Sequence, residues 1–136
     1  MEGEKHKILI VDDDSFLLDM YAFKFSQNNF EIYTASSAAM VLEKLRDGLR
    51  PDILLTDIIM PDMDGFEMME IVNKENLSPN SVRIFFSNKS QLSDIERGTA
   101  LGAVGFITKS NFTPAEVIEQ VLAILKNNVP KKDVVK

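Results

Sequence analysis

Acidic residues stand directly after two short apolar runs of the sequence, where a carboxylate must leave water. Asp12 and Asp13 follow "ILIV", and Asp57 follows "ILLT". Two other apolar runs end in groups of different chemistry, the hydroxyl of Ser87 and the ammonium of Lys109. A carboxylate nucleophile, further acids for a metal, a hydroxyl and a lysine are the groups needed to accept a phosphoryl group on an aspartate.

The three acids also predict a metal site if the fold brings them together. At about 4 Å and an effective dielectric constant near 20, each pair of carboxylates repels by roughly 4 kcal/mol, so a cation should meet them. Oxygen ligands without histidine or cysteine beside them favour a hard ion. We therefore expect Mg²⁺ at Asp12, Asp13 and Asp57, with Mn²⁺ or Ca²⁺ as possible substitutes.

The elements that must position these groups follow from hydrophobic patterning. Five short apolar runs, 7–12, 30–35, 53–57, 82–87 and 104–108, alternate with segments of helical period, 14–27, 36–48, 64–76, 90–102 and 113–128. This alternation predicts an α/β fold with a doubly wound, five-stranded parallel sheet and five helices, flavodoxin-like (βα)5. The runs 8–11 and 53–55 are continuously apolar, as central strands are, whereas 30–35 partly alternates, as an edge strand does. A strand order of 2-1-3-4-5 satisfies both patterns and places the ends of the first and third strands side by side.

Other acids are better explained by local structure than by a ligand role. Asp14 and Asp64 each precede a segment of helical period, and Glu67 stands three residues after Asp64. Thr113 and Glu116 have the same spacing around a proline. These pairs predict helix N-caps and capping boxes.

Length and composition restrict the function classes. With 136 residues, 45% of them hydrophobic, the chain is long enough for one domain with a proper core. The formal net charge of −6 argues against direct binding of nucleic acid, and zero cysteines exclude disulfides and thiol catalysis. We found neither a signal-peptide pattern nor an apolar stretch that could span a membrane. The expectation is a cytoplasmic domain over residues 1–126, followed by a polar C-terminal tail over 127–136.

Taken in order, the motifs resemble the response-regulator receiver domain of two-component signalling, of the single-domain kind found in chemotaxis regulators. The matching features are the acidic pair Asp12–Asp13, "TDIIMPDMDG" around Asp57, the hydroxyl of Ser87, and "GFITK" ending at Lys109. One of these motifs alone is common, whereas all four at successive strand ends are specific. The resemblance covers residues 6–126.

The resemblance implies a role for each matching position. Asp57 would be the phospho-acceptor. Asp13 and Asp57 would bind Mg²⁺ directly, Asp12 largely through water, and the backbone carbonyl of Ile59 would complete the protein ligands. Two residues, Ser87 and Lys109, would contact the phosphoryl oxygens. Phe106 would occupy the aromatic position whose rotamer reports the switch.

The implied function is a phospho-accepting signalling switch. The phosphoryl group would come from a histidine kinase or a histidine phosphotransfer protein, and a downstream protein would bind the face formed by the fourth helix, fifth strand and fifth helix. Such a protein catalyses its own phosphorylation and dephosphorylation but is not a dedicated enzyme. Kinase partners of this family approach beside the first helix. Helical spacing there puts Leu17, Met20 or Tyr21, and Phe25 against the sheet, and leaves Phe16, Leu18 and Phe23 exposed.

The sequence departs from the family pattern at three positions. Asn88 stands where the family usually has Ala or Gly, and a larger polar side chain there could either crowd the approach of a phosphodonor or hold a water and change the rate of hydrolysis. Ser110 stands where the family usually has proline, often after a cis bond, and Phe106 replaces the commoner tyrosine. These departures keep a second hypothesis open, a constitutive interaction module that is never phosphorylated. A phosphohydrolase of the haloacid dehalogenase type is disfavoured because Ile59 stands where such enzymes carry an acid.

Overall fold

Strands and helices alternate along the whole described chain. The computed structural model describes residues 5–89 and 91–128. Its strands are β1 (His6–Val11), β2 (Phe30–Ala35), β3 (Ile53–Thr56), β4 (Val82–Ser87) and β5 (Ala103–Thr108). Its helices are α1 (Ser15–Ser26), α2 (Ala38–Arg46), α3 (Gly65–Lys74), α4 (Leu92–Ala100), the short 3-10 helix η1 (Lys109–Asn111) and α5 (Pro114–Asn128).

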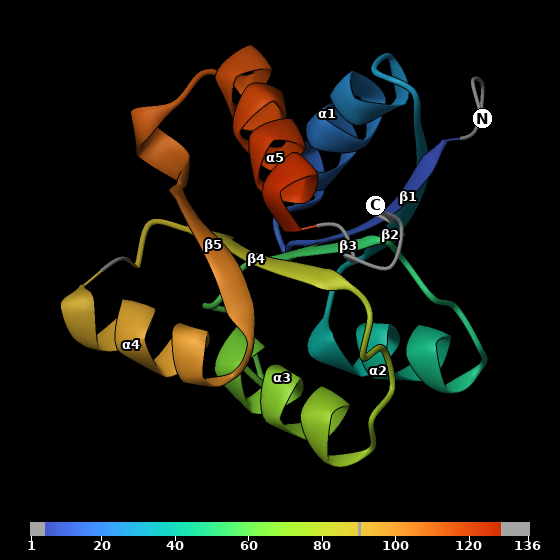
Figure 1. Ribbon diagram of the computed structural model, residues 1–136, viewed down its shortest axis with the longest axis vertical. Helices are drawn as coiled ribbons and strands as arrows, with labels where there is room; N and C mark the ends of the chain where they lie inside the picture. Colours follow the sequence, from blue (N-terminus) through green and yellow to red (C-terminus); the bar gives the residue numbers. More distant parts are fainter. Residues whose placement is uncertain (1–4, 90, 129–136) are drawn as a thin grey trace, which may run out of the picture.

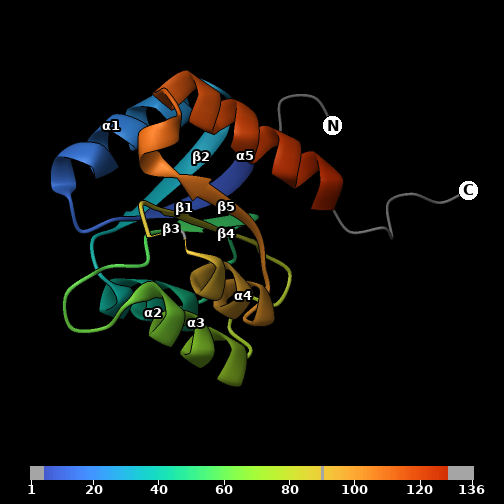
Figure 2. The same ribbon diagram turned by 90° about the vertical axis from the view of Figure 1, so that its left-hand side faces the viewer.

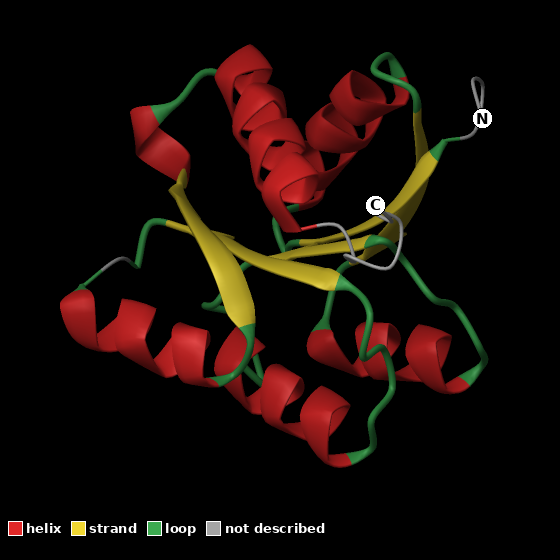
Figure 3. Ribbon diagram, viewed as in Figure 1, coloured by secondary structure: helices red, strands yellow, loops and turns green. Residues whose placement is uncertain are grey.

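The strands form one parallel sheet in the order β2-β1-β3-β4-β5, which confirms the predicted fold. Helices cover both faces of this sheet (Figure 1). Helices α1 and α5 pack on one face, and α2, α3 and α4 lie on the other, as the turned view in Figure 2 also shows. Colouring by secondary structure separates the three layers plainly (Figure 3). The carboxyl ends of β1 and β3 are therefore neighbours, as the site requires.

Side chains of the central strands divide the core into two halves because successive residues of a strand point to opposite faces. Leu9 and Leu54 join one buried cluster, beneath α2 and α3. Ile8, Ile53 and Leu55 join the other, beneath α1 and α5. Burying each such side chain contributes about 1.5–3 kcal/mol. Both faces of β1 and β3 are thus covered, which explains why these runs are continuously apolar.

Helix α1 packs on the sheet with Tyr21 and Phe25, as expected, and one further residue differs from the expectation. Leu18 is buried rather than exposed, and it begins a stripe with Tyr21 and Phe25. The expectation for Leu18 was wrong because α1 carries apolar residues nearly all round, so periodicity did not fix the rotation of the helix. Phe16 and Phe23 are 75% and 60% exposed, as predicted.

The predicted helix starts are confirmed. The Asp14 carboxylate accepts hydrogen bonds from the backbone N–H groups of Phe16 and Leu17. Asp64 and Glu67 form a reciprocal capping box at α3. Helix α5 continues to Asn128, and residues 129–136 lie outside the described residues, so the boundary at residue 126 stays a prediction. No helix in the described part of the chain has the length and apolar character needed to cross a membrane.

Candidate acidic site at the carboxyl edge of the sheet

The backbone ladder of the sheet places two of the acids side by side. Val11 and Thr56 are paired residues at the ends of β1 and β3. The next residue along β3, Asp57, donates its N–H to the Val11 carbonyl at 3.0 Å, and Asp12 donates its N–H to the Ala35 carbonyl of β2 at 3.2 Å. Sheet hydrogen bonds thus continue one residue past each strand, and they fix the backbones that carry both carboxylates.

Gly65 allows α3 to begin directly against the backbone of Asp57. Its N–H donates to the Ile58 carbonyl at 2.7 Å. A Cβ atom at this position would overlap the carbonyl oxygen of Asp57 and lie 3.1 Å from the Ile58 Cα. Only glycine leaves room for this approach. The "DG" pair of the sequence therefore supplies both the α3 cap, Asp64, and the glycine that lets α3 begin against the backbone of Asp57.

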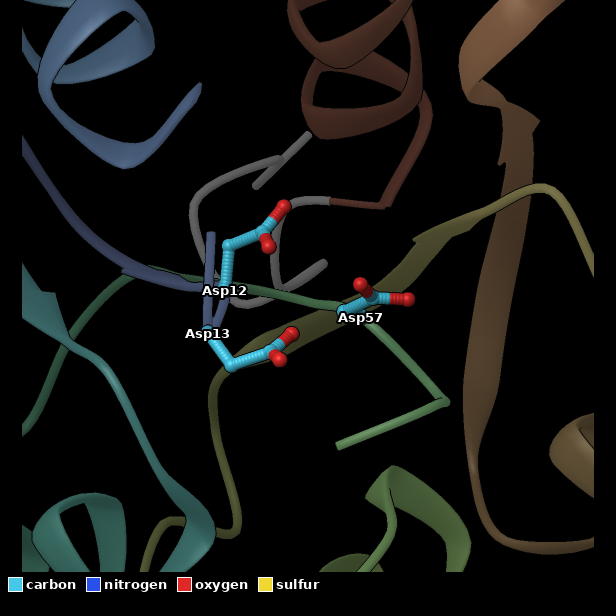
Figure 4. Close-up of side chains that lie close together, drawn as sticks. All are labelled: Asp12, Asp13 and Asp57. Carbon is cyan, nitrogen blue, oxygen red and sulfur yellow. The ribbon is translucent and has the colours of Figure 1, made fainter. Parts of the chain in front are cut away.

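The three acids meet in one cluster, as the sequence predicts. Oxygen atoms of Asp12, Asp13 and Asp57 all lie within 4.8 Å of one another. Figure 4 shows Asp12 and Asp13 projecting from the chain after β1 toward the carboxylate of Asp57, which comes from the chain after β3. Asp12 and Asp57 are buried, whereas Asp13 is exposed. The cluster lies in an open pocket of about 380 Å³ that Ser87 and Lys109 also line.

The cation that meets the buried acids in the structure is the Lys109 ammonium. Its Nζ lies 2.6 Å from Asp12 Oδ2 and 2.8 Å from Asp57 Oδ2. It also lies 5.5 Å from the centre of the Phe86 ring, which forms one wall beside it. Lys109 directly follows the edge strand β5 and begins η1. From there its side chain extends past the end of β4 to reach the acids.

Burial and the ion pairs act in opposite directions on the pKa values of this cluster. Burial raises the pKa of the Asp12 carboxyl above its ordinary value, although the Lys109 ammonium and the Asp14 N–H partly oppose this. For Lys109, burial alone would lower the pKa, but its hydrogen bonds to Asp12 and Asp57 and their charges outweigh burial and raise it. The lysine is therefore held in its charged form.

Asp57 and Asp12 are held in the same way, because in each carboxylate Oδ1 accepts a backbone N–H and Oδ2 accepts the Lys109 ammonium. In Asp57, the N–H that Oδ1 accepts is that of Ile58, at 2.7 Å. The side chain is 8% exposed, yet it lines the pocket. One oxygen is thus held by a backbone N–H, while the other is held by a side chain that a ligand could displace.

Ser87 lines the pocket, whereas Phe106 packs against Phe85 and α4. Ser87 is buried at the end of β4, and its Oγ accepts the Lys89 N–H at 3.2 Å. Phe106 packs on Phe85 with ring centres 5.5 Å apart. Its ring lies so close to α4 that a Cβ atom at Gly98 would overlap it. Phe106 therefore occupies space that exists only because α4 has a glycine there.

Two residues that the sequence singles out as departures from the family pattern are bonded to each other. The Asn88 Oδ1 accepts the backbone N–H of Ser110 at 2.9 Å. The described residues contain no cis peptide bond, so the bond before Ser110 is trans. Ile59 is 63% exposed and lines the pocket, and the role of its carbonyl stays a prediction. Sequence reasoning named Asn88 and Ser110 separately and missed their contact.

The arrangement suits chemistry on an anionic, oxygen-rich ligand. It offers a carboxylate that can act as nucleophile, two acids that can bind a hard cation, a buried hydroxyl and a lysine. All of them open to one pocket.

Comparison with known proteins adds an independent observation. The family model described as "Response regulator receiver domain" matches residues 8–122. The chain is 28% identical over 128 residues to the DNA-binding response regulator MtrA of Mycobacterium tuberculosis, a match that covers 94% of this chain and 54% of that protein. It spans about half the length of the curated relatives it matches, among them the regulatory protein PhoP of Bacillus subtilis, at 29% identity, 90% of this chain and 49% of that protein.

Solved structures show the same fold. A CheY-like receiver domain protein from Methanospirillum hungatei superposes with a TM-score of 0.81 at 28% identity, covering 91% of this chain and 96% of that one. The BeF3-activated receiver domain of DrrB gives a TM-score of 0.74 at 23% identity, covering 90% of this chain and 98% of that one, and this likeness shows the fold alone.

Proposed function

The chain belongs to the response regulator receiver domain family, and from this premise we propose that Asp57 accepts a phosphoryl group and that the modified site changes what the protein binds. The observation that carries the proposal is the convergence of Asp57, two further acids, Ser87 and Lys109 on one pocket. The protein is a signalling switch of this family rather than a dedicated enzyme.

In the proposed step, an oxygen of Asp57 attacks the phosphorus of the donor. The new bond joins Asp57 Oδ to phosphorus, and the bond that breaks joins phosphorus to the donor, a histidine nitrogen in a kinase or phosphotransfer protein or an acyl oxygen in acetyl phosphate. The leaving group departs with the electron pair of that bond. Both Asp57 oxygens accept a hydrogen bond. We assign the attack to Oδ2 because its partner is the Lys109 side chain, which can transfer its contact to the phosphoryl oxygens, whereas the partner of Oδ1 is the backbone N–H of Ile58.

The donor set of the acidic cluster fits Mg²⁺. It consists of carboxylate oxygens only, all within 4.8 Å of one another, which is the chemistry that a hard cation prefers. We propose that Asp13 and Asp57 would hold the ion directly, that Asp12 would assist largely through water, and that the backbone carbonyl of Ile59 would complete the protein ligands. When bound, Mg²⁺ would neutralise charge on the transferring oxygens.

Lys109 and Ser87 convert the new charge into movement. Phosphorylation adds about two negative charges at neutral pH. The Lys109 ammonium already contacts Asp57, so it can follow the charge from the carboxylate to the phosphoryl oxygens. The Ser87 hydroxyl, at the end of β4, can donate to them as well. Phe106 lies on β5, the strand that directly precedes Lys109, and packs against α4, so a shift of Lys109 would repack the α4–β5–α5 face that we propose for a downstream partner.

A histidine kinase or histidine phosphotransfer protein would approach the pocket from α1 and the chain after β3. Two exposed apolar side chains flank this approach, Phe16 at 75% and Ile59 at 63% exposure. Single exposed apolar residues are common on protein surfaces and need no function, but two of them beside the proposed approach are suited to contact a partner protein.

Intact-mass measurement after incubation with acetyl phosphate tests the proposal. The wild type should gain the mass of one phosphoryl group with Mg²⁺ and none with EDTA. Asp57→Asn should gain none, with an unchanged circular dichroism spectrum. Equal labelling of wild type and variant would show that another residue is the acceptor. If acetyl phosphate labels neither protein and the wild type does not bind BeF3, the constitutive interaction module would be favoured.

A further inference from the structure

A side-chain hydrogen bond joins the two loops that carry the switch residues. Asn88 directly follows Ser87, the last residue of β4, and Ser110 directly follows Lys109, the first residue after β5. The Asn88 Oδ1 accepts the Ser110 N–H at 2.9 Å. We call this contact the 88–110 tie.

The tie needs both departures from the family pattern at once. A proline at position 110 would have no N–H to donate. An alanine or glycine at position 88 would have no side-chain oxygen to accept it. Asn88 and Ser110, each unusual alone, therefore form a single structural feature. A trans bond before Ser110 is consistent with it, since no cis peptide bond occurs in the described chain.

Resting on the proposed function, we propose that Asn88 is a positioning residue that holds Lys109 over Asp57 through the Ser110 backbone. The Lys109 ammonium reaches Asp12 and Asp57 from η1, whose first residue it is. The tie fixes the second residue of η1 to the end of β4. It therefore limits how far η1 can move away from the acids, and it makes the loops that carry Ser87 and Lys109 move together.

This proposal reverses the effect expected from bulk alone. If Asn88 merely crowded the pocket, which it lines, Asn88→Ala would speed labelling by acetyl phosphate. If Asn88 positions Lys109, the same variant slows labelling, because the lysine spends less time over Asp57. The two explanations predict opposite changes in the labelling rate of Asn88→Ala. They also differ in whether that change depends on the residue at position 110.

A double-mutant cycle separates them. Asn88→Ala removes the acceptor, Ser110→Pro removes the donor but keeps the bulk at position 88, and the third protein combines both. Ser110→Ala is the matched control, because it alters the side chain but retains the N–H. The first readout is the rate of acetyl-phosphate labelling with saturating Mg²⁺, resolved into its maximal rate and its half-saturating concentration.

The proposal predicts that each single variant lowers the maximal rate by about two- to tenfold, the range that one net hydrogen bond corresponds to. The double variant should be no slower than either single one, because the same contact is lost only once. If Asn88→Ala is labelled faster, both with Ser110 and with proline at position 110, the proposal would be overturned in favour of crowding. Additive losses, or a change confined to the half-saturating concentration, would also overturn it.

Hydrogen exchange of the Ser110 amide, followed by NMR, is the second readout and does not depend on phosphorylation. Wild type and Ser110→Ala should protect this amide, and Asn88→Ala should lose the protection. If wild type is not labelled at all, the proposed function fails, while amide exchange still decides whether the tie exists. Should Ser110→Pro fail to fold, Asn88→Ala decides by the sign of its rate change together with amide exchange; an unprotected Ser110 amide in wild type would refute the tie.

Discussion

Replacing Lys109 by methionine should destabilise the protein strongly in the absence of metal. The ammonium contacts Asp12 at 2.6 Å and Asp57 at 2.8 Å, and the lysine side chain is only 15% exposed. Methionine keeps the length and the apolar stem but leaves two buried carboxylates without the cation that now offsets them. Removing one partner of such a network is costlier than the network itself is stabilising.

The expected size follows from the geometry. At about 4 Å and an effective dielectric constant of 20, one pair of unit charges interacts by roughly 4 kcal/mol, and most of that gain is offset by desolvation. Losing one partner of a buried ion pair costs about 3–5 kcal/mol. Because the pocket is open and Asp12 can take up a proton, we place the loss near the lower end, at about 3 kcal/mol.

Urea denaturation in EDTA at neutral pH measures this loss, with Lys89→Met as the matched control. Lys89 also pairs with an acid, Asp94, at 3.2 Å, but its side chain is 41% exposed. That variant should lose less than about 1 kcal/mol. The penalty of Lys109→Met should disappear as the pH rises through the pKa of Lys109, which lies above its ordinary value, because the wild type then loses the same charge. Lys109→Met as stable as the wild type at neutral pH would refute the account of the cluster.

Three further predictions concern the acids and the contact between Gly98 and Phe106. Asp13→Asn should raise stability in EDTA by less than about 1 kcal/mol, because it removes an exposed repelling charge, and it should abolish stabilisation by Mg²⁺ in thermal melts. The raised pKa of Asp12 means that its ionisation opposes folding; the stability of wild type relative to Asp12→Asn should therefore fall as the pH rises from about 4 to neutrality in EDTA, and a rise would contradict burial as the cause. Gly98→Ala should destabilise by about 1–3 kcal/mol through overlap with Phe106, although a glycine replaced inside a helix usually gains up to about 1 kcal/mol. Adding Phe106→Ala should remove the overlap, and stability curves of the four proteins would show it.

The fold was predictable because its strongest signals are local. The continuous apolar runs 8–11 and 53–55 can be central parallel strands, and the acids that follow them must then lie at the same edge of the sheet. That logic brought Asp12, Asp13 and Asp57 together correctly. Predicting that these three acids meet required only the order of the strands in the sheet and their parallel direction.

The rest depends on side-chain placement, which no local pattern encodes. Leu18 is buried because the rotation of α1 is set by packing, and periodicity is weak in a helix that is apolar nearly all round. The sequence places Lys109 after β5, but the bridge it makes between two acids depends on its rotamer. Two contacts, Asn88 with Ser110 and Phe106 with Gly98, join loops and elements whose spacing only the folded chain fixes.

The central claim is that Asp57, and neither of the acids beside it, carries the phosphoryl group. Because oxygens of all three lie within 4.8 Å, loss of labelling in a variant cannot by itself separate nucleophile from metal ligand. Borohydride reduces an aspartyl phosphate to homoserine, so peptide mass spectrometry of the labelled and reduced wild type identifies the acceptor directly. The account predicts homoserine at position 57 in the Mg²⁺ sample and none in the EDTA sample. Homoserine at position 12 or 13 would contradict it.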